Sequence, residues 1–192
     1  TGPTSLSDAL PARDFRRALR GTGVALIAEC KQRSPSGGLL QQPYDPVNLA
    51  RRYAANGASA ISVLTEPEFF SGFLVDLQAA RRATALPALR KDFVLDPYQV
   101  LEARVAGADA VLLIVAAIGD SGLYAELAAA AQEYGLAALV EVHDERELDA
   151  AFEAEPAIVG INQRNLRTFT VDTGLARRLR PRIQAGVVTV AE

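Results

Sequence analysis

Lysine is scarce in this chain. Of the 20 basic side chains only Lys31 and Lys91 are lysines, and the others are arginines. Arginine stays protonated in proteins, whereas the pKa of lysine shifts readily on desolvation, so lysine can give up a proton or form an imine. Both lysines follow short apolar runs. They are therefore candidate functional groups, although two leftover surface lysines would give the same count.

Other absences exclude whole classes of protein. A single cysteine, Cys30, rules out an internal disulfide and fits a reducing compartment, which predicts a cytoplasmic protein. No apolar stretch reaches the roughly 18 residues of a membrane span, and residues 1–10 lack the pattern of a signal peptide. The net charge is −3 and the arginines are interspersed with acids. We therefore expect no nucleic-acid and no membrane partner.

Short apolar runs alternate with helical patterns along the chain. The runs are too apolar for half-exposed strands and are typical of a parallel sheet covered on both faces. Strands are predicted near residues 25–29, 60–64, 88–90, 110–114, 137–141, 158–161 and 187–190. Helices are predicted near residues 46–56, 73–83, 97–106, 122–134, 145–153 and 173–179, after a short amphipathic helix at 12–20.

Helix boundaries carry their own signals. Asp45-Pro46 and Asp96-Pro97 each combine an N-cap acid with proline at the first helical position. Glycines that suit a left-handed helix exit follow three of the helices: Gly57, Gly107 and Gly135.

The alternation predicts an α/β fold with a parallel sheet. A doubly wound open sheet and a closed eight-stranded barrel are the two candidates. Residues 34–38 after the first strand read Ser-Pro-Ser-Gly-Gly and lack the G-x-G-x-x-G turn of a dinucleotide sheet. Polar groups at most strand ends favour the (β/α)8 TIM barrel. Since such barrels have about 250 residues, we expect one barrel domain over 1–192, truncated after strand 7 and lacking the final helix-strand-helix, with a short extra N-terminal helix.

Motifs at predicted strand ends carry a family resemblance. They are Ala28-Glu29-Cys30-Lys31 followed by Ser34-Pro35-Ser36, then Leu89-Arg90-Lys91-Asp92-Phe93, Val140-Glu141-Val142-His143 and Gly160-Ile161-Asn162-Gln163-Arg164-Asn165-Leu166. In this order they closely resemble indole-3-glycerol phosphate synthase, a (β/α)8-barrel lyase of tryptophan biosynthesis. The resemblance runs from about Phe15 to Glu192. Each motif alone would be weak, and their order makes the resemblance specific.

The resemblance implies a reaction and a set of roles. The family converts 1-(2-carboxyphenylamino)-1-deoxyribulose 5-phosphate to indole-3-glycerol phosphate by ring closure, with loss of carbon dioxide and water. By resemblance, Lys91 is the acid for ring closure and Lys31 holds the substrate carboxylate or serves as an acid in dehydration. Glu141 is a base or electrostatic partner, and Glu29 orients Lys31 or stabilises charge.

Further residues match the family's pattern. By resemblance, Asn162 and Glu192 belong to the catalytic set with those four. The implied substrate-binding residues are Ser34 at the phosphate, Phe70 and Phe93 at the anthranilate ring, and Arg164. Departures occur at Gly37, where many relatives have lysine, and at Phe73, where relatives have a small residue. The family also continues past the glutamate that matches Glu192, with Ser-Gly and an eighth strand.

Each residue also has a plainer explanation. Glu29 and Lys31 point the same way on a strand and could form an ordinary ion pair. Glu141 could cap the helix near Asp144, Asn162 and Asn165 could be turn residues, and the phenylalanines could be core.

Two residues that invite a catalytic role are predicted not to have one. His143 has no proton that we can name for it to take, so we do not expect it to be a base. Cys30 is predicted to be an inert, buried thiol.

Two other functions stay open at this stage. One is a Schiff-base aldolase with Lys31 or Lys91 as the nucleophile, and the other is a non-catalytic barrel fragment that binds sugar phosphates. No metal is expected, because no cluster has ligand spacing, and no organic cofactor is implied. We expect a monomer acting on a phosphorylated small molecule, with fusion to or association with another tryptophan-pathway enzyme left open.

Overall fold

A computed structural model of the chain describes residues 6, 9–165, 168 and 170–192, so Leu166 of the last motif lies outside it. Its centre is a parallel sheet of seven strands in the order β1-β4-β5-β6-β7-β8-β9. The strands are β1 (Ile27–Cys30), β4 (Ala60–Leu64), β5 (Ala88–Lys91), β6 (Ala110–Ile114), β7 (Ala137–Val142), β8 (Ile158–Ile161) and β9 (Val188–Ala191). The predicted parallel α/β sheet is confirmed, with β1 and β9 at its two edges.

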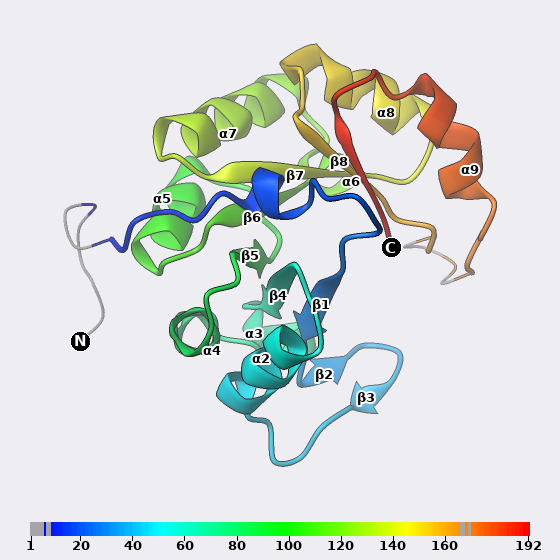
Figure 1. Ribbon diagram of the computed structural model, residues 1–192. Coiled ribbons are helices and arrows are strands. Elements are labelled where there is room, and N and C mark those ends of the chain that lie inside the picture. The colour runs from blue at the N-terminus through cyan, green and yellow to red at the C-terminus, as the bar shows by residue number, and fades with distance from the viewer. Residues whose placement is uncertain (1–5, 7–8, 166–167, 169) are drawn as a thin grey trace.

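Helices cover the outer side of the sheet, which curls around its inner side (Figure 1). The helices of the chain are α1 (Phe15–Ala18), α2 (Pro46–Ala55), α3 (Pro67–Phe70), α4 (Leu74–Ala83), α5 (Pro97–Val105), α6 (Val115–Ile118), α7 (Ser121–Glu133), α8 (Glu145–Ala151) and α9 (Leu175–Leu179). Of these, α1 packs against the inner side of the sheet. Short 3-10 turns follow α8 and α9, at η2 (Phe152–Ala154) and η3 (Arg180–Arg182). A small hairpin of β2 (Arg33–Ser34) and β3 (Gly38–Leu39) lies between β1 and α2.

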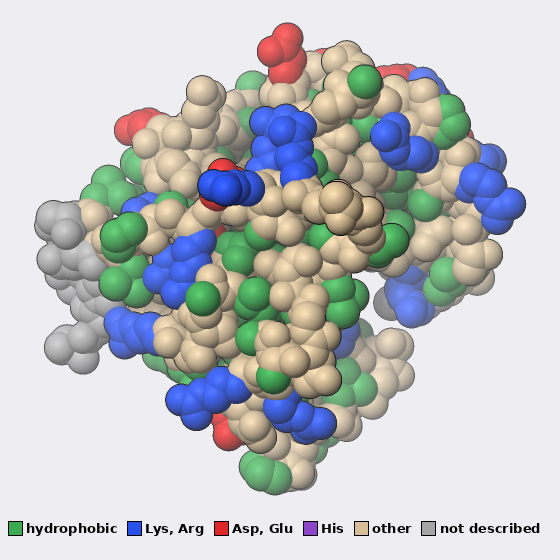
Figure 2. Space-filling model, viewed as in Figure 1, with side chains coloured by type: hydrophobic (Ala, Val, Ile, Leu, Met, Phe, Trp, Pro, Cys, Tyr) green, Lys and Arg blue, Asp and Glu red, His purple; other side chains and the backbone are tan. Residues whose placement is uncertain are grey.

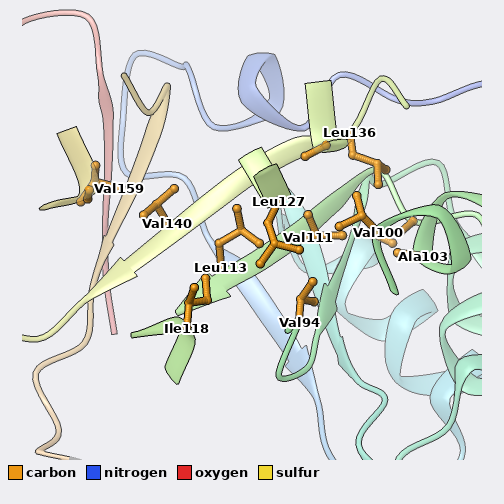
Figure 3. Packing of buried hydrophobic residues seen from close by; sticks show 14 of the residues in the cluster. Val94, Val100, Ala103, Val111, Leu113, Ile118, Leu127, Leu136, Val140 and Val159 are labelled. Carbon is orange, nitrogen blue, oxygen red and sulfur yellow. The ribbon is translucent and has the colours of Figure 1, made fainter. Parts of the chain in front are cut away.

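The two faces of the sheet pack into separate apolar layers because side chains alternate along each strand. Figure 3 shows the outer layer, where Val111 and Leu113 of β6 point toward Leu127 of α7. The inner layer contains Leu89, Leu112 and other strand residues, together with the fully buried Phe15 of α1. The N-terminal helix thus closes the inner side at the start of the strands.

Most predicted boundaries hold to within one or two residues. Asp45 and Asp96 cap α2 and α5 as predicted, with proline in the first turn, and Gly57, Gly107 and Gly135 all have positive φ. The first helix is shorter than predicted, because the Asp14 carboxylate accepts a hydrogen bond from the Arg17 N–H and starts the helix at Phe15.

The hairpin, α3 and α6 were not predicted from the sequence. Each is too short to show a period.

Lys and Arg side chains are spread over the surface seen in Figure 2 and do not gather into one basic patch on that face. Within the described part of the chain, no helix has the length and apolar character needed to cross a membrane.

Candidate active site

Strand alternation places the candidate functional side chains on the inner face. One residue near the middle or start of each of five strands packs in the inner layer: Ile27, Leu89, Leu139, Ile158 and Val188. Side chains an even number of positions further along an extended chain share that face. These positions are Glu29 and Lys31, Lys91, Glu141, Asn162 and Glu192. Because all the strands are parallel, their carboxyl ends meet at one rim of the sheet.

Lys91 lies at the centre of a charged row along this rim. Its Nζ is 2.5 Å from Oε2 of Glu192 and 3.2 Å from Oε2 of Glu29. The other oxygen of Glu29 accepts a hydrogen bond from Lys31 Nζ. The row Lys31–Glu29–Lys91–Glu192 therefore joins β1, β5 and the end of β9, which are far apart in sequence.

Burial and the charges along the rim shift the pKa values of Lys91, Glu29 and Glu192. Burial would lower the pKa of Lys91, but the carboxylates of Glu192 and Glu29 outweigh it and raise that pKa above its usual value. Burial would likewise raise the pKa of Glu29, but Lys91 and Lys31 outweigh it and lower that pKa. For Glu192, burial together with Glu141 and Glu29 raises the pKa despite the ion pair with Lys91. Lys91 is consequently a cation held between two acids.

Glu141 is the most deeply buried acid of the rim, with 2% of its surface exposed. Its Oε1 accepts a hydrogen bond of 3.0 Å from Asn162 Nδ2 and lies 3.3 Å from His143 Nε2. Burial raises the pKa of Glu141, but His143, Lys91 and Asn162 together lower it below its usual value. Its Oε2 is buried and has no hydrogen-bond partner among the described residues. Glu141 is thus an ionised carboxylate with one oxygen uncommitted.

A cavity of about 350 Å³ opens beside Lys91 and Glu141. Its other walls are mostly apolar and come from strand β6 and from segments that follow other strands; they include Pro35, Phe69, Phe70, Phe93, Leu112, Ile114 and Asn162. A larger cavity of about 630 Å³ lies deeper on the inner side, between β1 and β9, and also reaches Lys91, Glu29 and Glu192. An apolar cavity with a few convergent polar groups is the usual form of a small-molecule site.

The remaining predicted residues lie nearby but in different settings. Ser34 is on β2, next to the cavity-lining Pro35, and its Oγ accepts a hydrogen bond of 3.0 Å from the Gly37 N–H. Arg164 lines a neighbouring cavity of about 570 Å³, together with His143 and Asn162. Asn162 also accepts from the Arg164 N–H at 2.9 Å, so it acts as a turn residue as well as a partner of Glu141.

The structure bears on two further expectations, a capping role for Glu141 and the burial of Cys30. Asp144, and not Glu141, caps α8 by accepting from the Glu147 N–H. Cys30 is fully buried in the outer layer, which confirms the predicted burial, and burial raises its pKa to about 12, as expected for an inert thiol.

Sequence reasoning missed a buried polar network behind Lys91. Arg90 lies on the outer face of β5 and pairs with Asp92 at 3.0 Å and Glu102 at 2.9 Å. Asp92 also accepts a hydrogen bond of 2.6 Å from the Thr65 hydroxyl. The only signal in the sequence was an arginine inside an otherwise apolar strand. The network braces the end of β5, where Lys91 lies, and the loop after it, which carries Phe93.

Over the described ranges, no group of three or more His, Cys, Asp or Glu side chains is placed to hold a metal ion. The expectation that no metal takes part stays a prediction.

A curled parallel sheet with a lysine–carboxylate row at its C-terminal rim defines a barrel-type α/β enzyme. Comparison with known proteins is more specific. The family model for indole-3-glycerol phosphate synthase matches residues 4–192. The chain is 54% identical over 182 residues to indole-3-glycerol phosphate synthase 2 of Streptomyces coelicolor, an alignment that covers 95% of this chain and 70% of the relative.

Two other relatives are similar to the same extent. The synthase of Nocardioides sp. is 51% identical over 98% of this chain and 72% of its own length. The synthase of Chlorobium phaeovibrioides is 48% identical over 97% of this chain and 73% of its own length. The chain belongs to the indole-3-glycerol phosphate synthase family, whose fold is the TIM barrel. The resemblance found in the motifs is confirmed.

Proposed function

We propose that this protein is an indole-3-glycerol phosphate synthase, a carboxy-lyase of tryptophan biosynthesis, and that the rim described above is its active site. The observation that carries the proposal is the position of Lys91. It is held 2.5 Å from Glu192 and 3.2 Å from Glu29, at the mouth of an apolar cavity of about 350 Å³. A cation fixed in this way can donate a proton to an oxygen that gains negative charge.

Substrate binding follows from the cavity walls. The anthranilate ring fits between the apolar side chains at the rim, among them Phe70 and Phe93. Lys31, paired with Glu29 at the adjacent rim position, holds the substrate carboxylate. Ser34 and Arg164 stay in the proposal as residues that contact the ribulose phosphate from the flanking loops.

Ring closure uses Lys91 as the acid. The aromatic carbon that bears the carboxylate attacks the ribulose carbonyl carbon, and the carbonyl oxygen takes the proton of Lys91 as its π bond breaks. Carbon dioxide then leaves, and the electrons of the broken carbon–carbon bond restore the aromatic ring. In the last step an acid protonates the hydroxyl, which departs as water, while a base removes a proton from the new ring. We assign Lys31 to the acid and Glu141 to the base.

The protonation of Lys91 favours this reaction over a Schiff-base aldolase. An amine nucleophile has to be neutral, whereas the two carboxylates raise the pKa of Lys91. Borohydride added with substrate would trap a lysine adduct in an aldolase and would leave the synthase unmodified.

The proposal includes the closed form of the barrel. Residues 1–192 would form one barrel domain, incomplete by a final helix-strand-helix. The further strand, outside these residues, would join β9 to β1, and the predicted truncation after the seventh strand is part of this proposal. The edge positions of β1 and β9 support it, as does the cavity of about 630 Å³ between them. The monomeric state, fusion to another tryptophan-pathway enzyme and the cytoplasmic location stay predictions.

Product formation tests the proposed function directly. The full-length protein is mixed with 1-(2-carboxyphenylamino)-1-deoxyribulose 5-phosphate, and indole fluorescence is followed with time. We expect fluorescence to appear and to be lost in Lys91→Ala. Absence of fluorescence with the wild-type, full-length protein would refute the function.

A further inference from the structure

His143 lies between two carboxylates. Its Nε2 is 3.3 Å from Glu141 Oε1, and its Nδ1 is 3.0 Å from Glu147 Oε2. The His143 side chain is only 12% exposed and that of Glu141 3%. An imidazole with a carboxylate at each nitrogen is stabilised in its charged form, in which both nitrogens carry protons.

Glu147 is itself held in place. Its Oε2 also accepts a hydrogen bond of 2.8 Å from the His143 backbone N–H. Its own N–H donates to the capping carboxylate of Asp144 at 2.9 Å. The first turn of α8 therefore fixes both the backbone and the ring of His143, and Nε2 is left facing Glu141.

His143 and Asn162 both face the same oxygen of Glu141, Oε1. Oε1 accepts the hydrogen bond from Asn162 and lies 3.3 Å from His143 Nε2, an ion-pair contact in which Nε2 makes no hydrogen bond to a described residue. The buried Oε2 has no hydrogen-bond partner in the described part of the chain. Glu141 also lines the cavity beside Lys91. A carboxylate oxygen that is buried, ionised and uncommitted is suited to accept a proton from a bound molecule.

We propose that His143 is a positioning residue for the synthase: braced by Glu147, it holds Glu141 ionised and leaves Oε2 of Glu141 to act as the base. This inference rests on the function proposed above. The sequence argued only that His143 is not itself the base, and the structure gives it a different task. The carboxylates of Glu141 and Glu147 outweigh burial and raise the pKa of His143 to about 9, which agrees with a charged ring at neutral pH.

Other charged groups act on His143 and Glu141. Lys91 on β5 and His143 both lower the pKa of Glu141. Glu192 at the end of β9 interacts with Glu141 as a like charge. The cavity next to His143 is lined by Asp144, Glu145, Arg164, Asp172 and Arg178. Of these, Asp172 and Arg178 form their own ion pair at 2.7 Å. Variants that leave these groups unchanged therefore isolate the effect of His143.

Proton NMR gives the first test, and it needs no substrate. His143 is the only histidine of the 192 residues, and the ring signals that disappear in His143→Gln identify it in the full-length protein. We expect these signals to titrate well above pH 6.5, and at lower pH in Glu147→Gln. Titration at or below pH 6.5 in the wild-type protein would overturn the inference, whatever the enzyme's activity.

The pH dependence of kcat gives the second test. In His143→Gln the pKa of Glu141 loses the effect of a cation, so we expect the acid limb of the profile to move up by about one pH unit. Activity on that limb would be about tenfold lower, with recovery at higher pH. Glu147→Gln should move the limb in the same direction by less. Glu145→Gln, an exposed acid in the same turn of α8, is the matched control.

The two tests separate the possible failures. A profile of His143→Gln that superimposes on the wild type, or an equal loss of kcat at every pH, would contradict a positioning role. A wild-type protein that forms no product would refute the proposed function, and the NMR titration would still report whether His143 holds its charge between the two acids.

Discussion

At the residue scale, Lys91 contributes both a positive charge and a proton that can be transferred. Lys91 pairs with Glu29 and Glu192, so its cation is part of the structure of the rim. Its proton is the group that the proposed reaction uses. Arginine retains the charge but does not release a proton at any ordinary pH, which allows the two contributions to be separated.

We expect Lys91→Arg to lower kcat by about 10²–10⁴-fold, the usual contribution of a general acid, with little change in thermal midpoint. Lys91→Met should lower kcat equally and also lower the thermal midpoint, because the carboxylates of Glu192 and Glu29 are left next to each other without the cation between them. Indole fluorescence measures the first effect and thermal unfolding the second. Wild-type activity in Lys91→Arg would remove Lys91 from the role of acid.

At the element scale, short turns place the cavity walls, and their sequence signals are weak. The carboxylate of Glu66 accepts hydrogen bonds from the N–H groups of Glu68, Phe69 and Phe70, which fixes the single turn of α3. Gly72 follows this turn and lies against the end of β4. A Cβ at Gly72 would come within 2.2 Å of the Leu64 carbonyl oxygen. The turn that carries Phe70 therefore requires glycine for close backbone approach.

We expect Gly72→Ala to displace the turn from β4, because the obstructing atom is backbone and cannot rotate away. The free energy of unfolding should fall by about 1–3 kcal/mol, and KM should rise as Phe70 shifts. Urea unfolding and steady-state kinetics measure the two effects. Gly21→Ala, where an added Cβ meets no atom within 4 Å, is the control and should change neither. A Gly72→Ala protein with unchanged stability and KM would contradict this account.

At the scale of the whole molecule, the rim has a charge pattern that couples stability to pH. Glu141 and Glu147 raise the pKa of His143 from 6.5 to about 9. A raised histidine pKa stabilises the folded state fully below about pH 6.5, and this contribution is lost as the pH rises through about 9.

The free energy of unfolding of the wild-type protein should therefore fall between pH 6.5 and 9 relative to that of His143→Gln. We expect the difference between the two proteins to change by about 1–3 kcal/mol over this interval. Urea titrations at a series of pH values measure it, and groups that titrate alike in the two proteins cancel in the comparison. Parallel curves would show that the charge of His143 does not contribute to folding.

Element type and order were predictable from sequence because they depend on local patterns. Short apolar runs predicted the strands, and Asp-Pro pairs predicted the starts of α2 and α5. The candidate rim residues could also be selected, since polar groups after parallel strands meet at one edge. The Arg90–Asp92–Thr65 network could not be predicted in this way, because its members come from two strand ends and their meeting depends on register.

The sequence by itself determined a parallel α/β sheet, the family, and two lysines at strand ends, because period, caps and motif order are all written along the chain. Only the tertiary structure decided which oxygen meets which nitrogen. Curling of the sheet brings Glu192 to Lys91, 101 positions earlier in the chain. Parallel pairing of β7 with β8, together with the first turn of α8, leaves Glu141 between Asn162 and His143. Such contacts depend on strand register and the direction of curl, which no local pattern encodes.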